Sequence, residues 1–276
     1  MKYYLTLLST VVLIICFSCK ENPKKNTETD INIVDPGIVE ENWKSLFNGE
    51  NLDGWIPKIN GFELNENYNN TFRVKNGAIV VSYDQYENFT NEFGHLFYKT
   101  PFSNYKFRLE YRFVGEQVTG GQAWAKKNSG IMIHCQPPES MLVNQGFPLS
   151  LEVQLLGGIN ENEERPSGNL CTPATHVIMD GKLVTEHCIT ANCKTYYGDE
   201  WIKAEVLVNN GSITHYINGI QVISYSNPTI GGEFLDTTSK DIQAMEGQPL
   251  TSGYISLQSE SHPIEFKNIE ILELEP

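Results

Sequence analysis

Short stretches of alternating apolar and polar residues, separated by tight turns, constrain this chain more than any other feature of its sequence. Asn76-Gly77, Asp180-Gly181 and Asn218-Gly219 each lie between two such stretches, which is the pattern of a β-hairpin. After the N-terminal region, no stretch of about ten residues keeps the 3.6-residue period of a helix. We therefore predict an all-β fold, a two-sheet antiparallel β-sandwich of the jelly-roll type.

The predicted strands alternate in polarity, so we expect one sheet to be concave with a polar face open to solvent. They cover residues 71–74, 78–82, 94–98, 105–114, 131–136, 151–155, 177–179, 182–185, 201–208, 212–217, 220–225, 254–258 and 264–272.

The N-terminus has the layout of an export signal. A basic residue precedes an apolar run from Leu5 to Phe17, which is shorter than a membrane-spanning helix. The segment Cys16-Phe17-Ser18-Cys19 resembles a bacterial lipobox. We predict a signal peptide over residues 1–18 and lipidation of Cys19, which would anchor an exported protein in the cell envelope. A soluble secreted product is the alternative.

Composition separates a tether from a folded domain. Residues 19–42 are polar and broken by proline, so they cannot bury apolar surface and are predicted to be a tether. Residues 43–276 are predicted to form the β-sandwich domain.

The formal net charge is −14 and the isoelectric point is about 4.9, so the chain lacks the basic surface that a nucleic-acid partner requires.

Four cysteines belong to the predicted folded domain: Cys135, Cys171, Cys188 and Cys193. In an oxidising compartment, Cys171 is expected to pair with Cys188 or with Cys193. A zinc site that includes His176 and His187 is the alternative, although no Cys-x-x-Cys spacing supports it.

The segment from Asn128 to Gly158 is the strongest candidate for a functional site. Its two predicted strands carry His134 on one and Glu152 and Gln154 on the other, each among alternating apolar residues. If the strands are neighbours, these three side chains project from one face of a sheet. A solvated sheet face without a site has the same pattern, and this alternative stays open.

Five blocks of sequence follow one another in a fixed order. They are Leu46-Phe47-Asn48-Gly49 with Leu52-Asp53-Gly54-Trp55, then residues 128–131, 151–154, 214–219 and 255–269. Together they resemble the DUF1080 family, also called the 3-keto-disaccharide hydrolase domain family, over about residues 43–274. Many members carry Arg where this chain has His134, and residues 171–194 resemble only a subset of the family.

The resemblance implies a concanavalin-like sandwich and an enzyme that cleaves 3-keto-glycosides or 3-keto-disaccharides. The implied reaction removes the proton on carbon 2, eliminates the aglycone and then adds water. It needs a general base and a group that polarises the ketone, and a divalent metal cation suits the second task. We predict Glu152 and His134 as the catalytic residues and as the ligands of such a metal. An upstream sugar 3-oxidoreductase is also implied.

Further residues are predicted to contact the carbohydrate substrate: Gln154, Asn128, Trp124, Gln258, Glu260 and His262. Trp124 lies in a glycine-containing loop directly before the central strand, where its ring could stack on a sugar. The alternatives are that Trp124 folds back onto the sandwich and that Gln154 forms a cross-strand amide pair.

Two other functional classes compete with the enzyme. One is a non-catalytic, lectin-like carbohydrate-binding lipoprotein, which the same sandwich would support equally well. The other is a structural surface lipoprotein without a cleft. A binding protein needs an aromatic platform and hydroxyl partners, whereas the enzyme also needs titratable groups with shifted pKa values.

Overall fold

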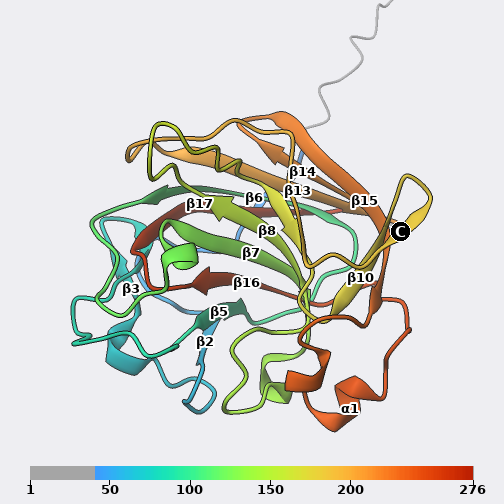
Figure 1. The fold of residues 1–276 in the computed structure, drawn as a ribbon, viewed down its shortest axis with the longest axis horizontal. Coiled ribbons are helices and arrows are strands. Elements are labelled where there is room, and N and C mark those ends of the chain that lie inside the picture. The colour runs from blue at the N-terminus through green and yellow to red at the C-terminus, as the bar shows by residue number, and fades with distance from the viewer. Residues whose placement is uncertain (1–40, 276) are drawn as a thin grey trace, which may run out of the picture. The chain divides into compact units, whose positions relative to one another are not determined.

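The computed structural model describes residues 41–275, which fold into two antiparallel β-sheets (Figure 1). The ten-stranded sheet has the order β11-β10-β15-β14-β13-β6-β17-β4-β3, with β1 paired to β17 off this path. The seven-stranded sheet has the order β12-β9-β8-β7-β16-β5-β2. The predicted signal peptide, Cys19 and nearly all of the predicted tether lie outside the described residues.

The strands of the ten-stranded sheet are β1 (Lys44–Ser45), β3 (Phe72–Lys75), β4 (Ala78–Val81), β6 (Tyr105–Phe113), β10 (Thr175–Met179), β11 (Lys182–Val184), β13 (Ile202–Asn209), β14 (Ser212–Ile217), β15 (Ile220–Ile230) and β17 (Ile264–Glu273). Those of the seven-stranded sheet are β2 (Trp55–Ile59), β5 (Gly94–Tyr98), β7 (Asn128–Cys135), β8 (Leu151–Leu156), β9 (Asn169–Cys171), β12 (Cys188–Ile189) and β16 (Tyr254–Ser259). The helices are η1 (Tyr68–Asn70), η2 (Ala123–Ala125), η3 (Pro138–Ser140), η4 (Leu235–Thr237) and α1 (Lys240–Gln243). No helix within residues 41–275 is long and apolar enough to cross a membrane.

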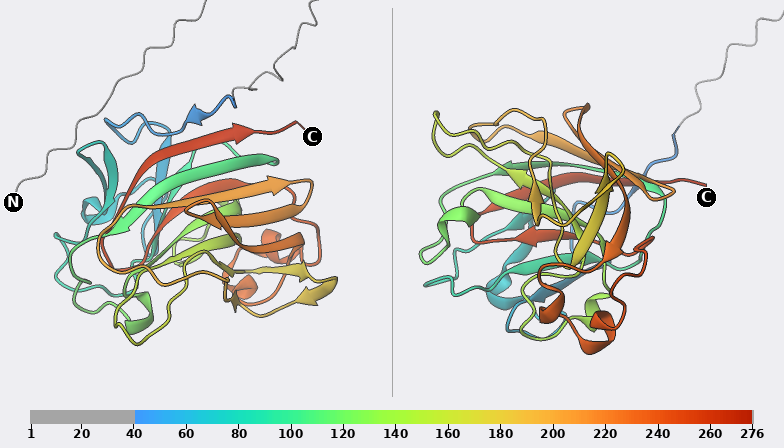
Figure 2. Two further views of the ribbon diagram at one scale, coloured as in Figure 1. Left: turned by 90° about the horizontal axis from the view of Figure 1, so that it is seen from above. Right: turned by 45° about the vertical axis from the view of Figure 1, so that its right-hand side comes forward.

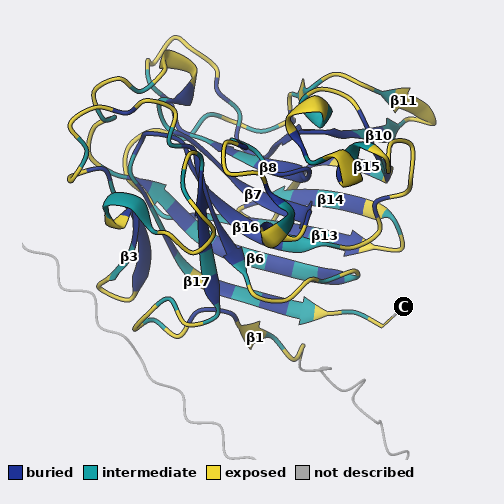
Figure 3. Cartoon of the chain, turned by 90° about the horizontal axis from the view of Figure 1, so that it is seen from below, coloured by how far each residue is buried: buried dark blue, intermediate teal, exposed yellow. Residues whose placement is uncertain are grey.

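The two sheets pack face to face on one hydrophobic core. In β6 every second residue is buried, beginning with Tyr105 and Phe107, because successive side chains of a strand point to opposite faces. Ile131, Val153 and Leu257 of the seven-stranded sheet belong to the same buried cluster. Figure 2 shows the strands of the described residues from two further directions, and Figure 3 shows that strand centres are buried while loops are exposed. The predicted two-sheet sandwich is confirmed.

The predicted hairpins are also confirmed. Asn76 and Gly77 join β3 to β4 with φ angles of 53° and 74°. Both angles lie in the left-handed region, as a two-residue type I′ turn requires, and Asn and Gly adopt this region most readily. Asp180-Gly181 and Asn218-Gly219 join β10 to β11 and β14 to β15 in the same way.

β7 departs from the predicted alternation at His134. The φ angle of this residue is 51°, and the pairing of β7 with β16 shifts here, as in a β-bulge. The His134 ring therefore turns into the space between the sheets, where it lies edge-on to the Tyr105 ring with centroids 6.3 Å apart. The prediction that His134 shares a face with Glu152 and Gln154 is wrong.

A disulfide joins the last two strands at one edge of the seven-stranded sheet. Cys171 of β9 and Cys188 of β12 lie directly opposite each other and are covalently linked. Cys135 and Cys193 are free. Of the two pairings that the sequence left open for Cys171, the structure contains the one with Cys188.

The disulfide is expected to stabilise the domain. It links residues that are 17 positions apart, and a loop of this size restricts the unfolded chain by about 3 kcal/mol. Urea denaturation should therefore show that Cys188→Ser lowers the free energy of unfolding by about this amount. Cys193→Ser, which removes a free thiol, is the control and should cost about 1 kcal/mol or less. Equal losses in the two variants would contradict the prediction.

Candidate active site

A cavity of about 340 Å³ lies on the face of the seven-stranded sheet that points away from the core. This volume falls in the range of small-molecule sites. The polar residues that line it are Asn128, Glu152, Gln154, His187 and Glu260. The other lining residues are Trp124, Phe147, Cys171, Pro173, Cys188 and Phe234. Four of the predicted substrate contacts and one of the two predicted catalytic residues therefore meet at one cavity.

Glu152 is placed by its neighbours on both sides. It lies opposite Met132 of β7 and Cys171 of β9. Its side chain extends across Gly130, where an added Cβ would lie only 2.6 Å from Glu152 Oε1. That oxygen is buried and has no hydrogen-bond partner among the described residues. The missing side chain at Gly130 thus provides the space that the carboxyl group occupies.

Glu260 provides a second carboxyl group in the cavity. It follows β16 directly, is 3 % exposed, and its Oε2 has no partner among the described residues. Burial raises the pKa of Glu152 to about 8. Burial and the charge of Glu152 raise the pKa of Glu260 well above its ordinary value. Because two close buried carboxylates disfavour each other's ionisation, the pair retains a proton at neutral pH.

A row of buried polar side chains continues this face of the sheet beyond Gly130. Gln258 of β16 lies opposite His95 of β5, which lies opposite Lys58 of β2. The amide of Gln258 and both ring nitrogens of His95 have no hydrogen-bond partner within residues 41–275. Burial, and then the charge of Lys58, lower the pKa of His95 to about 3, so this imidazole is neutral. Gln258 is therefore on the predicted face, although it does not line the cavity.

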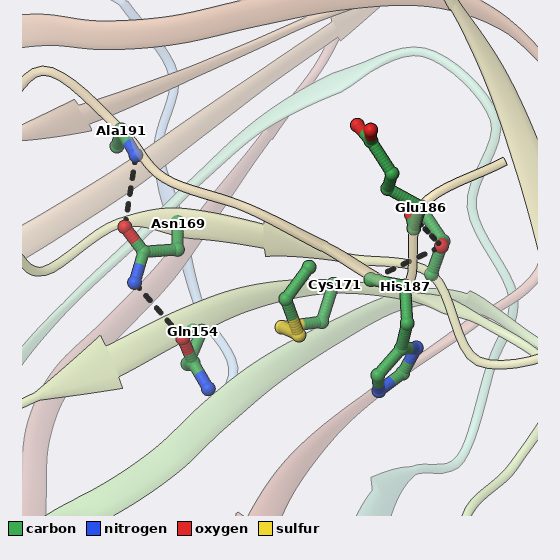
Figure 4. The surroundings of a disulfide bond; sticks show 8 residues. Gln154, Asn169, Cys171, Glu186, His187 and Ala191 are labelled. Carbon is green, nitrogen blue, oxygen red and sulfur yellow. Dashed lines mark hydrogen bonds between the residues drawn. A yellow bond between two sulfur atoms is a disulfide. The ribbon is translucent and has the colours of Figure 1, made fainter. Parts of the chain in front are cut away.

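Two amide side chains complete the floor. Asn128 is buried, and its Oδ1 has no partner in the described part of the chain. Gln154 Oε1 accepts a hydrogen bond of 2.9 Å from Asn169 Nδ2, and Asn169 Oδ1 accepts one from the Ala191 N–H (Figure 4). Gln154 is thus held in a cross-strand amide pair and also lines the cavity, which combines the two alternatives that the sequence left open.

Aromatic rings form one wall. Trp124 of η2 is 48 % exposed and stacks on Phe93, with ring centroids 5.7 Å apart. Phe93 contacts Phe147, which contacts Phe234, and the Phe234 ring lies 5.0 Å from that of His187. Trp124 therefore occupies the rim position that the sequence predicted for it.

The sequence did not predict that Phe147, Phe234 and His187 line the cavity, although it offered His187 as a ligand of an alternative zinc site. The two phenylalanines lie in loops without any periodic pattern. His187 would have been found only from the pairing of the adjacent Cys188 with Cys171, which the sequence did not fix.

His262 is not brought to the cavity. It is 1 % exposed and packs edge-on against Phe113, with ring centroids 5.7 Å apart. Burial, followed by the charges of Lys127, Lys126 and Arg165, lowers its pKa to about 4. The prediction that His262 contacts substrate has no support in this position, because the side chain is enclosed beside the core.

The predicted metal ligands are not brought together either. His134 lies between the sheets, whereas Glu152 lines the cavity on the outer face. Within residues 41–275, the only group of three candidate ligand residues is Cys171, His187 and Cys188. Its two sulfur atoms form the disulfide, so they are not available as thiolates. The residues present do not fit the predicted site, and we derive no step through a metal ion.

Several solved structures are similar to this chain at low sequence identity. A provisionally assigned glycosyl hydrolase of Parabacteroides distasonis ATCC 8503 shares 20% identity with a TM-score of 0.48, covering 84% of this chain and 94% of that chain. A second one from the same organism shares 18% identity with a TM-score of 0.49, covering 84% and 99%. The carbohydrate-binding module CBM66 of Bacillus subtilis shares 7% identity with a TM-score of 0.39, covering 67% and 89%. No curated protein matches the chain.

A family model covers almost the whole of the described domain. The model of the 3-keto-alpha-glucoside-1,2-lyase-like domain matches residues 42–272, a range that includes all the residues lining the cavity. The family resemblance seen in the sequence blocks is thus confirmed, and the chain belongs to the 3-keto-alpha-glucoside-1,2-lyase-like domain family.

Proposed function

We propose that this domain cleaves 3-keto-glycosides by eliminating the aglycone and then adding water to the unsaturated sugar. The observation that carries the proposal is the Glu152–Glu260 pair, two buried carboxyl groups with raised pKa values in one cavity. Groups with perturbed pKa values in a cavity are candidates for proton transfer. Membership of the family supports the same class of substrate.

The substrate's ketone determines what the site has to do. A ketone at carbon 3 acidifies the proton on carbon 2, so a base can remove it and form an enolate. When the enolate collapses, a double bond forms between carbons 1 and 2, and the bond from carbon 1 to the aglycone oxygen breaks. The leaving oxygen then needs a proton. A carboxyl group that is still protonated at neutral pH can donate it, and we assign this role to Glu152.

A second function, a lectin-like binding module, is favoured by one observation. Trp124 is half exposed at the rim, where its ring is available for stacking on a sugar. Binding requires no proton transfer, so a binding module and an enzyme differ in how they respond to the loss of the Glu152 carboxyl group.

Aglycone release by wild type and by a variant without the Glu152 carboxyl group separates these two functions. We expect the purified domain to release the aglycone from a 3-keto-glucoside but not from the unoxidised parent glucoside. Glu152→Gln should lower kcat/KM by about 100-fold or more, because it removes the proton donor. His134→Asn, which tolerates the left-handed φ of the bulge, is the control and should keep kcat/KM within a few-fold of wild type. Aglycone release is measured by chromatography, both with chelator and with added Ca²⁺ or Mn²⁺.

Two outcomes would contradict the proposed reaction or the role of Glu152 in it. Saturable binding of the keto sugar without release would establish the binding module instead. Equal activity of Glu152→Gln and wild type would remove Glu152 from the proposed reaction.

Gly130→Ala adds a methyl group where the Glu152 carboxyl lies, and it is expected to reduce activity while the domain stays folded.

The raised pKa of Glu152 predicts how stability depends on pH. Below about pH 4.5, the carboxyl group is protonated in both the folded and the unfolded chain, so it does not make the stability depend on pH. Between pH 4.5 and about 8, the unfolded chain has lost the proton and the folded chain keeps it, so folding loses stability as the pH rises. Urea denaturation at pH 5 and pH 8 should show a smaller loss for Glu152→Gln than for wild type. An identical loss in both proteins would show that the group titrates normally.

The proposal includes export and anchoring by a lipid on Cys19. The Cys171–Cys188 disulfide supports export, because such bonds persist in oxidising compartments. Cell fractionation tests the anchor: wild type should be in the membrane fraction, and Cys19→Ser should lose both the lipid label and this location. Membrane association without the label would contradict lipidation. The keto substrate also requires a sugar 3-oxidoreductase upstream.

A further inference from the structure

His187 is the only imidazole that lines the cavity among residues 41–275, and the fold holds its main chain firmly. The His187 carbonyl accepts hydrogen bonds from the Thr172 N–H at 2.8 Å and from Thr172 Oγ1 at 3.2 Å. The next residue, Cys188, is covalently linked to Cys171. Two independent attachments thus fix this residue beside the end of β9.

The imidazole lines the same cavity as the carboxyl pair. A ring nitrogen of His187 and the sulfur atoms of Cys171 and Cys188 all lie within 4.8 Å of one another. Cys171 is in turn the cross-strand neighbour of Glu152. Cys171 is therefore a neighbour of both the imidazole and Glu152. His187 Nδ1 is buried and has no hydrogen-bond partner among residues 41–275.

Phe234 packs against the imidazole at a conformational cost. Its ring lies edge-on to His187, with centroids 5.0 Å apart and an interplanar angle of 69°. The φ angle of Phe234 is 69°, in the left-handed region that bulky residues rarely adopt. The loop is held there by a hydrogen bond of 2.6 Å from the Ala174 N–H to the Glu233 carbonyl. Strained backbone of this kind is retained most often where it positions a functional group.

The protonation states of the two groups are complementary. Burial lowers the pKa of His187, although the nearby charge of Glu233 opposes the shift, so the imidazole is neutral and can accept a proton. The carboxyl pair retains a proton and can donate one. A neutral imidazole and a protonated carboxyl group in one cavity are the combination that an elimination needs.

We propose that His187 is the general base of the elimination and that the Cys171–Cys188 disulfide positions it. This inference rests on the proposed function. The imidazole takes the proton from carbon 2, and the electron pair of that C–H bond becomes the double bond between carbons 1 and 2. The electrons of the bond to the aglycone leave with its oxygen, which takes a proton from Glu152. A proton returns from His187 to the carboxyl pair through solvent, so no oxidant or reductant is consumed.

The test separates base from acid. In D₂O, exchange of the carbon-2 proton of methyl 3-keto-glucoside, followed by NMR, reports the base alone. We expect His187→Gln to lower both exchange and aglycone release by about 100-fold or more. Glu152→Gln should keep exchange and lose release. With a 4-nitrophenyl aglycone, which leaves without a proton, Glu152→Gln should recover release and His187→Gln should not. His176→Gln, which changes a histidine outside the cavity, should behave as wild type.

Two further measurements distinguish the loss of the base from misfolding of the variant. Added imidazole should restore part of the exchange to His187→Ala, which a loss of folding would not allow. Reduction of the disulfide, with chelator present, should lower exchange in wild type and have no further effect on His187→Ala. Chelator is needed because the reduced cysteines and His187 together would offer three zinc ligands.

The outcomes distinguish this inference from the proposed function. Wild-type rates of exchange in His187→Gln would overturn the role of His187 and leave the enzyme in place. No exchange and no release in wild type would overturn the proposed function and the inference with it. Unchanged exchange after reduction would overturn the positioning role of the disulfide.

Discussion

Glu152 and Glu260 each bury a carboxyl oxygen that has no hydrogen-bond partner within residues 41–275, and the surrounding structure has to offset the free-energy cost. Glu152 and Glu260 lose hydration, and each opposes the ionisation of the other. The large core between the sheets provides the opposing stability, and the site lies on the outer face, so its polar groups do not interrupt that core. The sandwich thus supplies a rigid floor, and the loops that carry Trp124, Phe147 and Phe234 supply the wall.

The fold could be predicted from the sequence because its determinants are local. Asn76-Gly77 specifies a tight turn by itself, and the alternation in β6 identifies the buried face without knowledge of its partners. β9 and β12 were not predicted, since strands of three and two residues are too short to show a period. Their pairing depends on a disulfide whose partner the sequence left open.

The site could be predicted only in part, for physical reasons that differ between residues. Glu152 and Gln154 follow the regular pleat of β8, so their common face could be inferred. His134 lies on a bulge, and a positive φ at one residue reverses the face of a side chain without any change in the polarity pattern. His187 is placed at the cavity by its hydrogen bond with Thr172, 15 residues away, and by the disulfide of the adjacent Cys188 with Cys171. These residues become neighbours only after folding.

Gly130 has a consequence for reading related sequences. Its lack of a side chain has no role in a turn or in the core; it leaves space for one carboxyl group. A relative with the same sandwich but a larger residue at this position would keep the strands, the core and the aromatic rim while losing the place for that group. The residue at this position, rather than overall sequence similarity, is therefore a criterion that distinguishes family members able to cleave a sugar from those that only bind one.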